Sequence, residues 1–591
     1  MPQFIRVFQI ALIQALFLVF GRPGNALESD ATFCNPINID YRFALGGPSR
    51  REAADPVVVL FQGEYYLFAS KSGGYWHSSD LSRWKFVEPQ GLPIENYAPA
   101  VLVVGDALLY TAGASALYRT DDPKGGKWQQ IADLGKYGDP ALFQDQDGRI
   151  YLYYGLAKNG AISVVELDAQ TFAPKGQAVE SLRGDATTRG WERSGEANLG
   201  PSHFIEGAWM TRHKDTYYLQ YAAPGTIWNT YADGVFTAPS PLGPFTYAPN
   251  SPVSQHPTGF VGGAGHGCTF QDKNGHYWRA VTAVISVKER FERRISIFPA
   301  AFDRDGVMHT NTVFGDYPQL LPGKNGGKNA ASDNSAGWML LYAHQNAAAS
   351  SAMPGHGVGL AFDEDIRTHW SAKSGNRGEW LGVDLGKRCA IFALQINFAE
   401  QDTNAVGREE RLFHQYQVEV SNDGRNWSKI VDKSANLTDV PHDYVQLEAP
   451  RFARYLRITN LHMPGNGKFA IRDLRVFGNG LGRAPAPVRN VGVWRDPSDG
   501  REAVIGWKPA ARAEGYIVRY GIAPDKLYNS YQVRGATQLS LHSLNAGVTY
   551  YFAVDAFNSS GRTSENAARS AQMFSTLPAL QAAFSPALSQ R

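Results

Sequence analysis

Five segments in the first half of the chain repeat one pattern, and this repetition constrains the fold more than any other feature. Each segment begins with a polar or small residue and continues as an apolar strand, a turn containing Gly, Asp or Asn, and an aromatic-rich strand. Such pairs of strands are typical of β-hairpins. The five segments are Asp55–Ser70, Ala98–Gly113, Asp139–Gly155, Glu206–Ala222 and His266–Ala283.

Hairpins that recur every 40 to 70 residues or so are typical of propeller blades. The chain is therefore expected to be all-β and to begin with a five-bladed β-propeller over residues 35–322. In a propeller the innermost strand of each blade lines the central axis, and its first residue faces the axial cavity. Three carboxylates and a histidine should then converge there, because these positions hold Asp55, Ala98, Asp139, Glu206 and His266.

Each acid taken alone also has a structural explanation. Asp before Pro commonly opens a turn, which could account for Asp55 or Asp139, and Glu206 could pair with Arg212. A carboxylate beside a buried strand is costly unless it is paired or used, and three at equivalent repeat positions favour a functional site. The remaining nearby acids are expected to be solvated loop residues: Glu52, Glu192 and Glu196.

The repeats resemble glycoside hydrolase family 43, whose members are five-bladed propellers that cleave glycosidic bonds. The matching motifs are "ADPVVV", "GDPALF", "IEGAW" and "GAGHG", together with "APGTIWNTYADGVFTAPSPLGPF" after the fourth repeat. The resemblance implies an inverting mechanism with Asp55 as general base, Glu206 as general acid and Asp139 tuning the acid. A neighbouring anion raises the pKa of a carboxyl, so Glu206 could keep its proton near neutrality.

The resemblance also suggests further residues of the sugar site. It places His266 at the floor of the cavity, where it could help to hold water or a hydrated calcium ion. No cofactor is required and no directly ligated metal is expected, because a lone histidine is a poor calcium ligand. Trp76, Trp209 and Trp228 are candidates for the platform on which a sugar ring stacks, although core packing explains each equally well.

After the propeller, the polar, glycine-rich residues 323–337 indicate a linker. Residues 338–478 resemble a discoidin (F5/8 type C) domain, similar to carbohydrate-binding module family 32. The matching motifs are "AFDEDIRTHWSA", "GEWLGVDLG", "YQVEVSNDGRNW" and "RYLRITN". Its alternating strands fit a β-sandwich or jelly roll, which could bind glycans or serve a purely structural role.

Residues 487–577 resemble a fibronectin type III β-sandwich, through "AVIGWKP", "EGYIVRYG" and "LNAGVTYYFAVDAFNSSG". Tyr550 is the candidate for the tyrosine corner of such a domain. The tail after Leu577 is expected to be loose.

The N-terminus and the composition bear on location and partners. Arg6 precedes the apolar run "FQIALIQALFLVF" and a "GNA" stretch, which predicts a signal peptide over residues 1–26, a secreted (extracellular or periplasmic) protein and no membrane span. A net charge of +2 gives no sign of nucleic-acid binding, and a monomer is expected. Only Cys34, Cys268 and Cys389 occur; they cannot form a disulfide framework, and the last two are expected to be buried.

These features predict a secreted inverting exo-glycosidase that removes terminal arabinofuranosyl, xylosyl or galactosyl units from oligosaccharides or polysaccharides. The alternative is a non-catalytic glycan-binding or adhesion protein with an inactive propeller, against which the presence of all three acids speaks. No candidate catalytic residue lies after the linker. The propeller is therefore expected to fold and to act on small substrates without the later domains.

Overall fold

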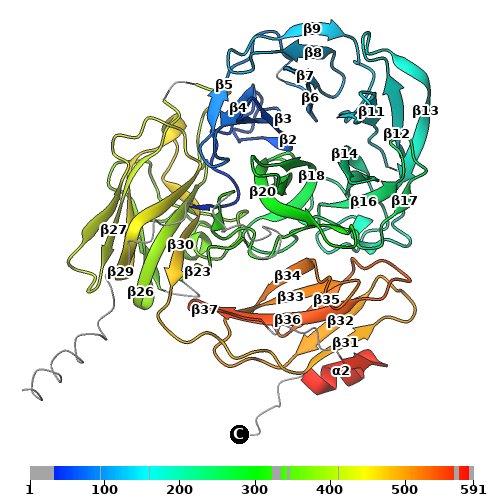
Figure 1. Ribbon diagram of the computed structural model, residues 1–591. Helices are drawn as coiled ribbons and strands as arrows, with labels where there is room; N and C mark the ends of the chain where they lie inside the picture. Colours follow the sequence, from blue (N-terminus) through cyan, green and yellow to red (C-terminus); the bar gives the residue numbers. More distant parts are fainter. Residues whose placement is uncertain are drawn as a thin grey trace, which may run out of the picture.

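The chain consists almost entirely of β-strands, which the computed structural model arranges in three packed units (Figure 1). Within the described part of the chain, no helix has both the length and the hydropathy of a membrane-spanning segment. The predicted signal peptide and residues 323–333 of the predicted linker lie outside the described residues. The described residues are 32–93, 95–158, 160–322, 334–341, 346–409, 411–564 and 572–584.

Five four-stranded antiparallel sheets surround a central axis and confirm the predicted propeller (Figure 1). Each sheet follows the chain order from its innermost to its outermost strand. The first two blades are β2 (Ala54–Phe61), β3 (Glu64–Ser70), β4 (Tyr75–Ser78) and β5 (Lys85–Val87), then β6 (Ala100–Val104), β7 (Ala107–Thr111), β8 (Leu117–Thr120) and β9 (Gln129–Ala132). The third and fourth are β10 (Ala141–Gln144), β11 (Ile150–Tyr154), β12 (Ala161–Leu167) and β13 (Pro174–Arg183), then β14 (Glu206–His213), β15 (Thr216–Ala223), β16 (Ala232–Ala238) and β17 (Thr246–Tyr247). The fifth is β18 (Gly262–Gln271), β19 (Tyr277–Val284), β20 (Arg293–Phe302) and β21 (Met308–Thr310).

Two short strands join the ends of the propeller unit. β1 (Thr32–Phe33) pairs with β22 (Gln319–Leu320), so the unit begins a few residues before the predicted boundary. A 3₁₀ turn, η1 (Gly190–Glu192), lies between the third and fourth blades. Apolar side chains fill the space between neighbouring blades, and in the largest such cluster the first and fifth blades share one core.

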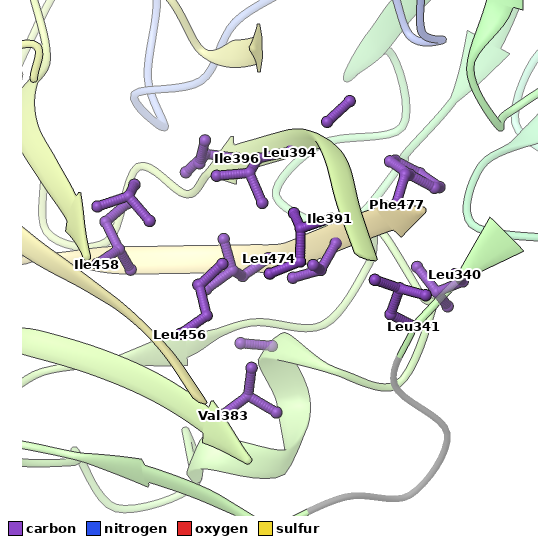
Figure 2. Close-up of a cluster of buried hydrophobic side chains, with 14 of the residues drawn as sticks. Leu340, Leu341, Val383, Ile391, Leu394, Ile396, Leu456, Ile458, Leu474 and Phe477 are labelled. Atoms are coloured by element: carbon purple, nitrogen blue, oxygen red, sulfur yellow. The ribbon is translucent and has the colours of Figure 1, made fainter. Parts of the chain in front are cut away.

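The second unit confirms the predicted discoidin-type β-sandwich. Its strands are β23 (Met339–Leu340), β24 (Ala347–Ala349), β25 (Trp370–Ser371), β26 (Trp380–Phe398), β27 (Gln415–Ser421), β28 (Ser428–Asp432), β29 (His442–His462) and β30 (Ala470–Asn479), with 3₁₀ turns η2 (Val358–Ala361) and η3 (Pro464–Asn466). Figure 2 shows the core, in which Leu394 and Ile396 of β26 pack near Leu474 of β30. Cys34 and Cys389 also lie in this core, and Cys268 is buried in the propeller, as expected.

The third unit is a sandwich of two four-stranded sheets that share one core around Trp507. One sheet has the order β35 (Gln538–Leu541), β32 (Ala503–Trp507), β31 (Val491–Arg495), β38 (Gln572–Phe574). The other has the order β34 (Asn529–Arg534), β33 (Gly515–Gly521), β36 (Tyr551–Asn558), β37 (Gly561–Thr563).

Tyr550 of the third unit accepts a hydrogen bond from the backbone N–H of Asn545 at 3.1 Å, as a tyrosine corner would. The fibronectin type III assignment stays a prediction. The expectation of a loose tail is wrong for its first residues, because α2 (Leu577–Phe584) packs on the first sheet: Leu580 is buried and the Phe584 ring contacts that of Phe574.

The units meet through buried charges as well as apolar contacts. Arg51 of the propeller donates to Glu400 of the second unit at 2.9 Å, and Arg472 of the second unit donates to Glu292 of the propeller at 2.8 Å. All four side chains are at most 3% exposed. These ion pairs argue against the expectation of a detachable propeller, since separating the units would leave these ions without partners.

The third unit is also attached firmly, and the predicted linker is not wholly loose. Asn545 donates to the backbone carbonyl of Ser251 at 2.8 Å, and Lys526 pairs with Asp303 at 3.1 Å. The described end of the linker pairs with the propeller, because Asn334 exchanges two hydrogen bonds, both 2.8 Å, with the backbone of Leu320.

A chain that ends at Pro322 is expected to be insoluble, or to unfold well below the full-length protein. Breaking a buried ion pair costs about 3–5 kcal/mol, a large fraction of the roughly 5–15 kcal/mol by which a domain is stable. Solubility on expression and the thermal midpoint by circular dichroism test this. Arg454→Ala, which breaks the partly exposed pair with Asp384, should leave the midpoint nearly unchanged. A soluble propeller with the full-length midpoint would contradict the prediction.

Candidate active site

A β-bulge interrupts the start of the innermost strand in three of the blades, the first, fourth and fifth. In β2, Ala54 pairs with Ser70 and Val57 pairs with Phe68. The two pairs are three residues apart on β2 but two residues apart on β3, so β2 contains one extra residue. β14 and β18 show the same register shift. Bulges re-aim the side chain that they carry. The five blades place one left-handed residue each at this point, Asp55, Ala98, Asp139, Gly207 and His266, with φ of 52°, 52°, 45°, 64° and 42°.

This register corrects the predicted position of Glu206. The left-handed residue of the fourth blade is Gly207, so Glu206 precedes the equivalent of Asp55 instead of matching it. Glu206 nevertheless lies in one cluster with Asp139 and His266. One oxygen of Asp139, one of Glu206 and one ring nitrogen of His266 all lie within 4.8 Å of one another.

Asp55 lies in an environment that favours its charged form. Ser70 donates to Oδ2 at 2.5 Å, Arg293 approaches Oδ1 at 3.4 Å and His266 Nδ1 lies 3.3 Å from the same oxygen. Burial alone would raise the pKa of Asp55, but the Arg293 guanidinium, His266 and the hydroxyls of Ser70 and Thr282 together lower it below its ordinary value. Asp55 is therefore a carboxylate at neutral pH.

Glu206 and Asp139 lie in the opposite kind of environment. Burial and the charge of Asp55 raise the pKa of Glu206 to about 7, against the hydrogen bond of 2.7 Å that Tyr231 donates to its Oε1. Burial and the charges of Glu206 and Asp55 raise the pKa of Asp139 well above its usual range. The two carboxyls thus hold at least one proton near neutrality. Glu206 is half-buried whereas Asp139 is buried, so Glu206 is the more accessible proton donor.

His266 packs against Gly207, and this contact explains the glycine. A Cβ at position 207 would lie 2.6 Å from Cγ of the His266 ring, which is too close for any side chain. His266 itself is held through its backbone N–H, which donates to Asp233 at 2.9 Å. Burial lowers the pKa of His266, so the ring is neutral among the acids.

Arg293 is a residue of the site that the sequence analysis missed. It is 2% exposed and donates to Glu52 at 3.0 Å and to Thr226 at 3.1 Å, besides contacting Asp55. The expectation that Glu52 is solvated is wrong, because it is buried as the second partner of this arginine. A pair of arginines at the start of a buried strand, "RRISIF", is the sequence signal that could have indicated it.

The expectation of solvation is also wrong for Glu192, which is fully buried and paired with Arg189, whereas Glu196 is exposed and pairs with Arg367 of the second unit.

The three tryptophan candidates differ in accessibility. Trp76 cannot stack on a sugar, because it is fully buried and its indole N–H donates to Asp40. Trp209 is half-buried, packs against the core of the first and fifth blades and donates to the carbonyl of Thr269 at 3.2 Å. Trp228 is half-buried in the loop between β15 and β16, which also carries Tyr231, so it stays a candidate for the platform.

A second aromatic group was also missed. Tyr97 immediately precedes Ala98 and so holds in the second blade the place that Glu206 holds in the fourth. It is 39% exposed, and its ring lies 5.9 Å from the ring of Phe291 and beneath the ammonium group of Lys71. Tyr97 and Phe291 are therefore accessible apolar surfaces beside the acids.

Asp139, Glu206 and His266 could together hold a metal ion, since their donor atoms are close enough to share one. Two carboxylate oxygens and one imidazole nitrogen are an incomplete set for calcium, which takes six to eight oxygen ligands. Water would have to supply most of the remaining ligands.

Comparison with known families agrees with this geometry. Residues 49–308 match the model of Glycosyl hydrolases family 43, and residues 346–474 match the model of the F5/8 type C domain. The first match covers the left-handed position of all five blades, and the second covers most of the discoidin-type sandwich.

Individual relatives resemble the propeller part of the chain. A β-D-galactofuranosidase, xynD, of Aspergillus niger is 27% identical over 272 residues, which cover 38% of this chain and 72% of the relative. A xylan 1,3-β-xylosidase of a Vibrio species is 26% identical over 267 residues, covering 38% and 46%. The chain therefore spans less than half of the second relative. A solved structure named "Glycoside hydrolase" shares 18% identity at a TM-score of 0.43, over 74% of this chain and 99% of its own.

Gly207→Ala is expected to abolish most activity, because the new methyl group would displace the His266 ring from beside Asp55. The matched control is Gly63→Ala: Gly63 has a similar φ of 78° but has no atom within 4 Å of its would-be Cβ. Both variants should lose about 1 kcal/mol or more of stability, since alanine is strained at positive φ. Thermal midpoints and turnover of an aryl glycoside separate the two effects. Equal activity in the two variants would show that the fit against His266 is unimportant.

Proposed function

We propose that this chain, which carries a family 43 glycoside hydrolase domain followed by an F5/8 type C domain, removes terminal sugar units from glycans with inversion at the anomeric carbon. One observation carries the proposal: the acids of one buried cluster have pKa values that are driven apart. Asp55 is kept ionised by Arg293, while Glu206 is kept protonated by burial and by the charge of Asp55. Such a separation assigns one group as base and the other as acid.

The reaction follows from these protonation states. Asp55 removes a proton from a water molecule, whose oxygen attacks the anomeric carbon of the bound sugar. Glu206 gives its proton to the glycosidic oxygen as the bond to that oxygen breaks, so the departing sugar leaves as a neutral alcohol. Asp139 shares the remaining proton with Glu206, because the charge of Glu206 disfavours ionisation of Asp139. At the end Asp55 is protonated and Glu206 is ionised, and exchange with water restores both.

The relatives suggest which sugars to test. Their names describe activity on β-D-galactofuranosides and on 1,3-β-xylan, and a further relative of Humicola insolens, 31% identical over 141 residues, is named a xylosidase/arabinosidase. We infer that this chain acts on xylosides, arabinofuranosides or galactofuranosides. Tyr97, Phe291 and Trp228 would provide the faces on which the ring stacks.

The proposal also covers secretion, glycan binding by the second unit and a bound ion. Secretion rests on the apolar N-terminal segment, and glycan binding by the second unit rests on its F5/8 type C match. A largely hydrated calcium ion beside His266 is compatible with the donor set. A non-catalytic glycan-binding role would not require the acids to be buried and electrostatically separated, so the geometry favours the enzyme.

The roles of the two acids can be separated by the leaving group. Glu206→Gln cannot donate a proton, so cleavage of a disaccharide should fall by about 10²–10⁴-fold. A nitrophenyl group leaves as a stable anion, and its release should fall far less. Asp55→Asn removes the base that both substrates need, so both rates should fall alike. Steady-state kinetics on both substrates test this, and the opposite pattern would exchange the two roles.

The decrease of activity at high pH should reflect the loss of the proton that Glu206 and Asp139 hold. Activity needs the proton of Glu206, so kcat/KM for a disaccharide should fall as the pH rises through about 7. The hydroxyl of Tyr231 stabilises the ionised form of Glu206, so Tyr231→Phe should raise the pKa and move this decrease to higher pH. A pH profile of the two proteins measures the shift. A decrease that moves to lower pH would contradict this role for the hydroxyl.

A further inference from the structure

Two chain segments lie behind Asp55, and their successive side chains point alternately towards the sugar site and towards the second unit. In residues 51–52 the side chain of Glu52 faces Arg293, whereas that of Arg51 faces the second unit. In residues 292–294 the side chain of Arg293 faces Asp55, while Glu292 and Arg294 face the second unit. Neighbours along extended chain point to opposite sides, so whatever holds the outer side chains also places the inner ones.

The second unit holds these outer side chains with a connected ionic network. Arg51 donates to Glu400 at 2.9 Å and to Asp439 at 3.0 Å. Arg472 donates to Glu292 at 2.8 Å and lies 3.6 Å from the second oxygen of Glu400. One continuous chain of charges therefore joins the segment before Glu52 to the segment before Arg293.

Two further side chains, Arg294 and Lys288, join the segments to one another and to the network. Arg294 donates to the backbone carbonyl of Arg51 at 3.0 Å and to His442 of the second unit at 2.8 Å. Lys288 donates to the backbone carbonyl of Glu400. Burial alone would raise the pKa of Glu400, but Arg51 and Arg472 hold it far below its usual range, so Glu400 stays charged.

Water has little access to this network. Arg51 and Glu292 are fully buried, Arg472 is 2% exposed and Glu400 is 3% exposed. A buried charge that loses its partner cannot be solvated in place, so the chain that carries it must shift. The contact that such a shift would disturb is a long one, since Arg293 reaches Asp55 at 3.4 Å while it also donates to Thr226.

We propose that Arg472 and Glu400 of the discoidin-type unit are positioning residues of the active site, which set the placement of Arg293 and Glu52 behind Asp55. The second unit would then be part of the catalytic apparatus as well as a module that could bind glycans. The inference rests on the proposed role of Asp55 as the base. It assigns a catalytic effect to two residues that do not touch the cavity.

Arg472→Lys tests this role. Lysine keeps the positive charge but presents a single ammonium group, which cannot span Glu292 and Glu400 as the guanidinium does. We expect kcat for a nitrophenyl glycoside to fall by about 10- to 100-fold, since small misplacements of catalytic groups have effects of this size, while KM stays nearly unchanged. Kinetics are measured well below the thermal midpoint of the variant, so that unfolding does not contribute.

The matched control is Arg475→Lys. Arg475 of the second unit is also fully buried between the units, where it pairs with Glu364 at 2.8 Å and with Asp316 of the propeller at 3.7 Å. Its hydrogen bonds and ion pairs go to Cys34, Asp316, Glu364 and Gln395, which lie outside residues 51–52 and 292–294. We expect a comparable loss of thermal midpoint, with kcat kept within about twofold of the wild type.

The outcomes distinguish the inference from the proposed function. The positioning role alone would be overturned if the wild type is active and Arg472→Lys leaves kcat unchanged. It would also be overturned if Arg475→Lys lowers kcat as much as Arg472→Lys does. A folded wild type without activity on any xyloside, arabinofuranoside or galactofuranoside would overturn the proposed function and this role with it. If Arg472→Lys does not fold, Glu400→Gln provides the same test, because it removes the charge and keeps the shape.

Discussion

The structure depends on one backbone distortion at the start of the innermost strands. The left-handed residues at this point bring the side chains of Asp55, Asp139 and His266 together, so the propeller carries a cluster of polar groups at its centre. L-residues adopt this conformation at a cost, and four of the five blades do so with a residue other than glycine. The exception is Gly207, which lacks a side chain and so leaves the space that the His266 ring fills. The carboxyl of the fourth blade belongs to the preceding residue, Glu206.

The site gives three similar carboxyl groups different pKa values. Asp55, Asp139 and Glu206 are chemically alike, and each is removed from bulk water. Arg293 and two hydroxyl groups favour the charged form of Asp55, and that charge in turn discourages ionisation of the other two. Arg293 and these hydroxyl groups thus make Asp55 the first of the three acids to lose its proton. Glu52 lies beside Arg293, where it offsets the remaining positive charge.

The repeats and the acids could be predicted because their signals are local. Hairpin turns, strand alternation and the "DP" and "EG" motifs can each be read within a few residues. The predicted position of Glu206 differs by one residue from the observed register, because a bulge depends on how the backbones of two strands pair. Arg293 was missed because it meets Asp55 only when the fifth blade closes on the first, 238 residues along the chain. Trp76 of β4 is a core ring and Tyr97 of the loop before β6 is an accessible one, and only the packing around each ring distinguishes them.

The network between the propeller and the second unit has a consequence for the order of events during synthesis. Arg51 emerges early from the ribosome, yet its partners Glu400 and Asp439 follow more than 340 residues later. The first strand, β1, likewise has to wait for Gln446, whose side chain accepts hydrogen bonds from both the backbone and the hydroxyl of Thr32. The N-terminal edge of the propeller, to which β1 and Arg51 belong, is thus left without these partners until most of the chain has been translated. Exposure of that unfinished edge makes the nascent chain dependent on protection from aggregation for longer than its modular appearance suggests.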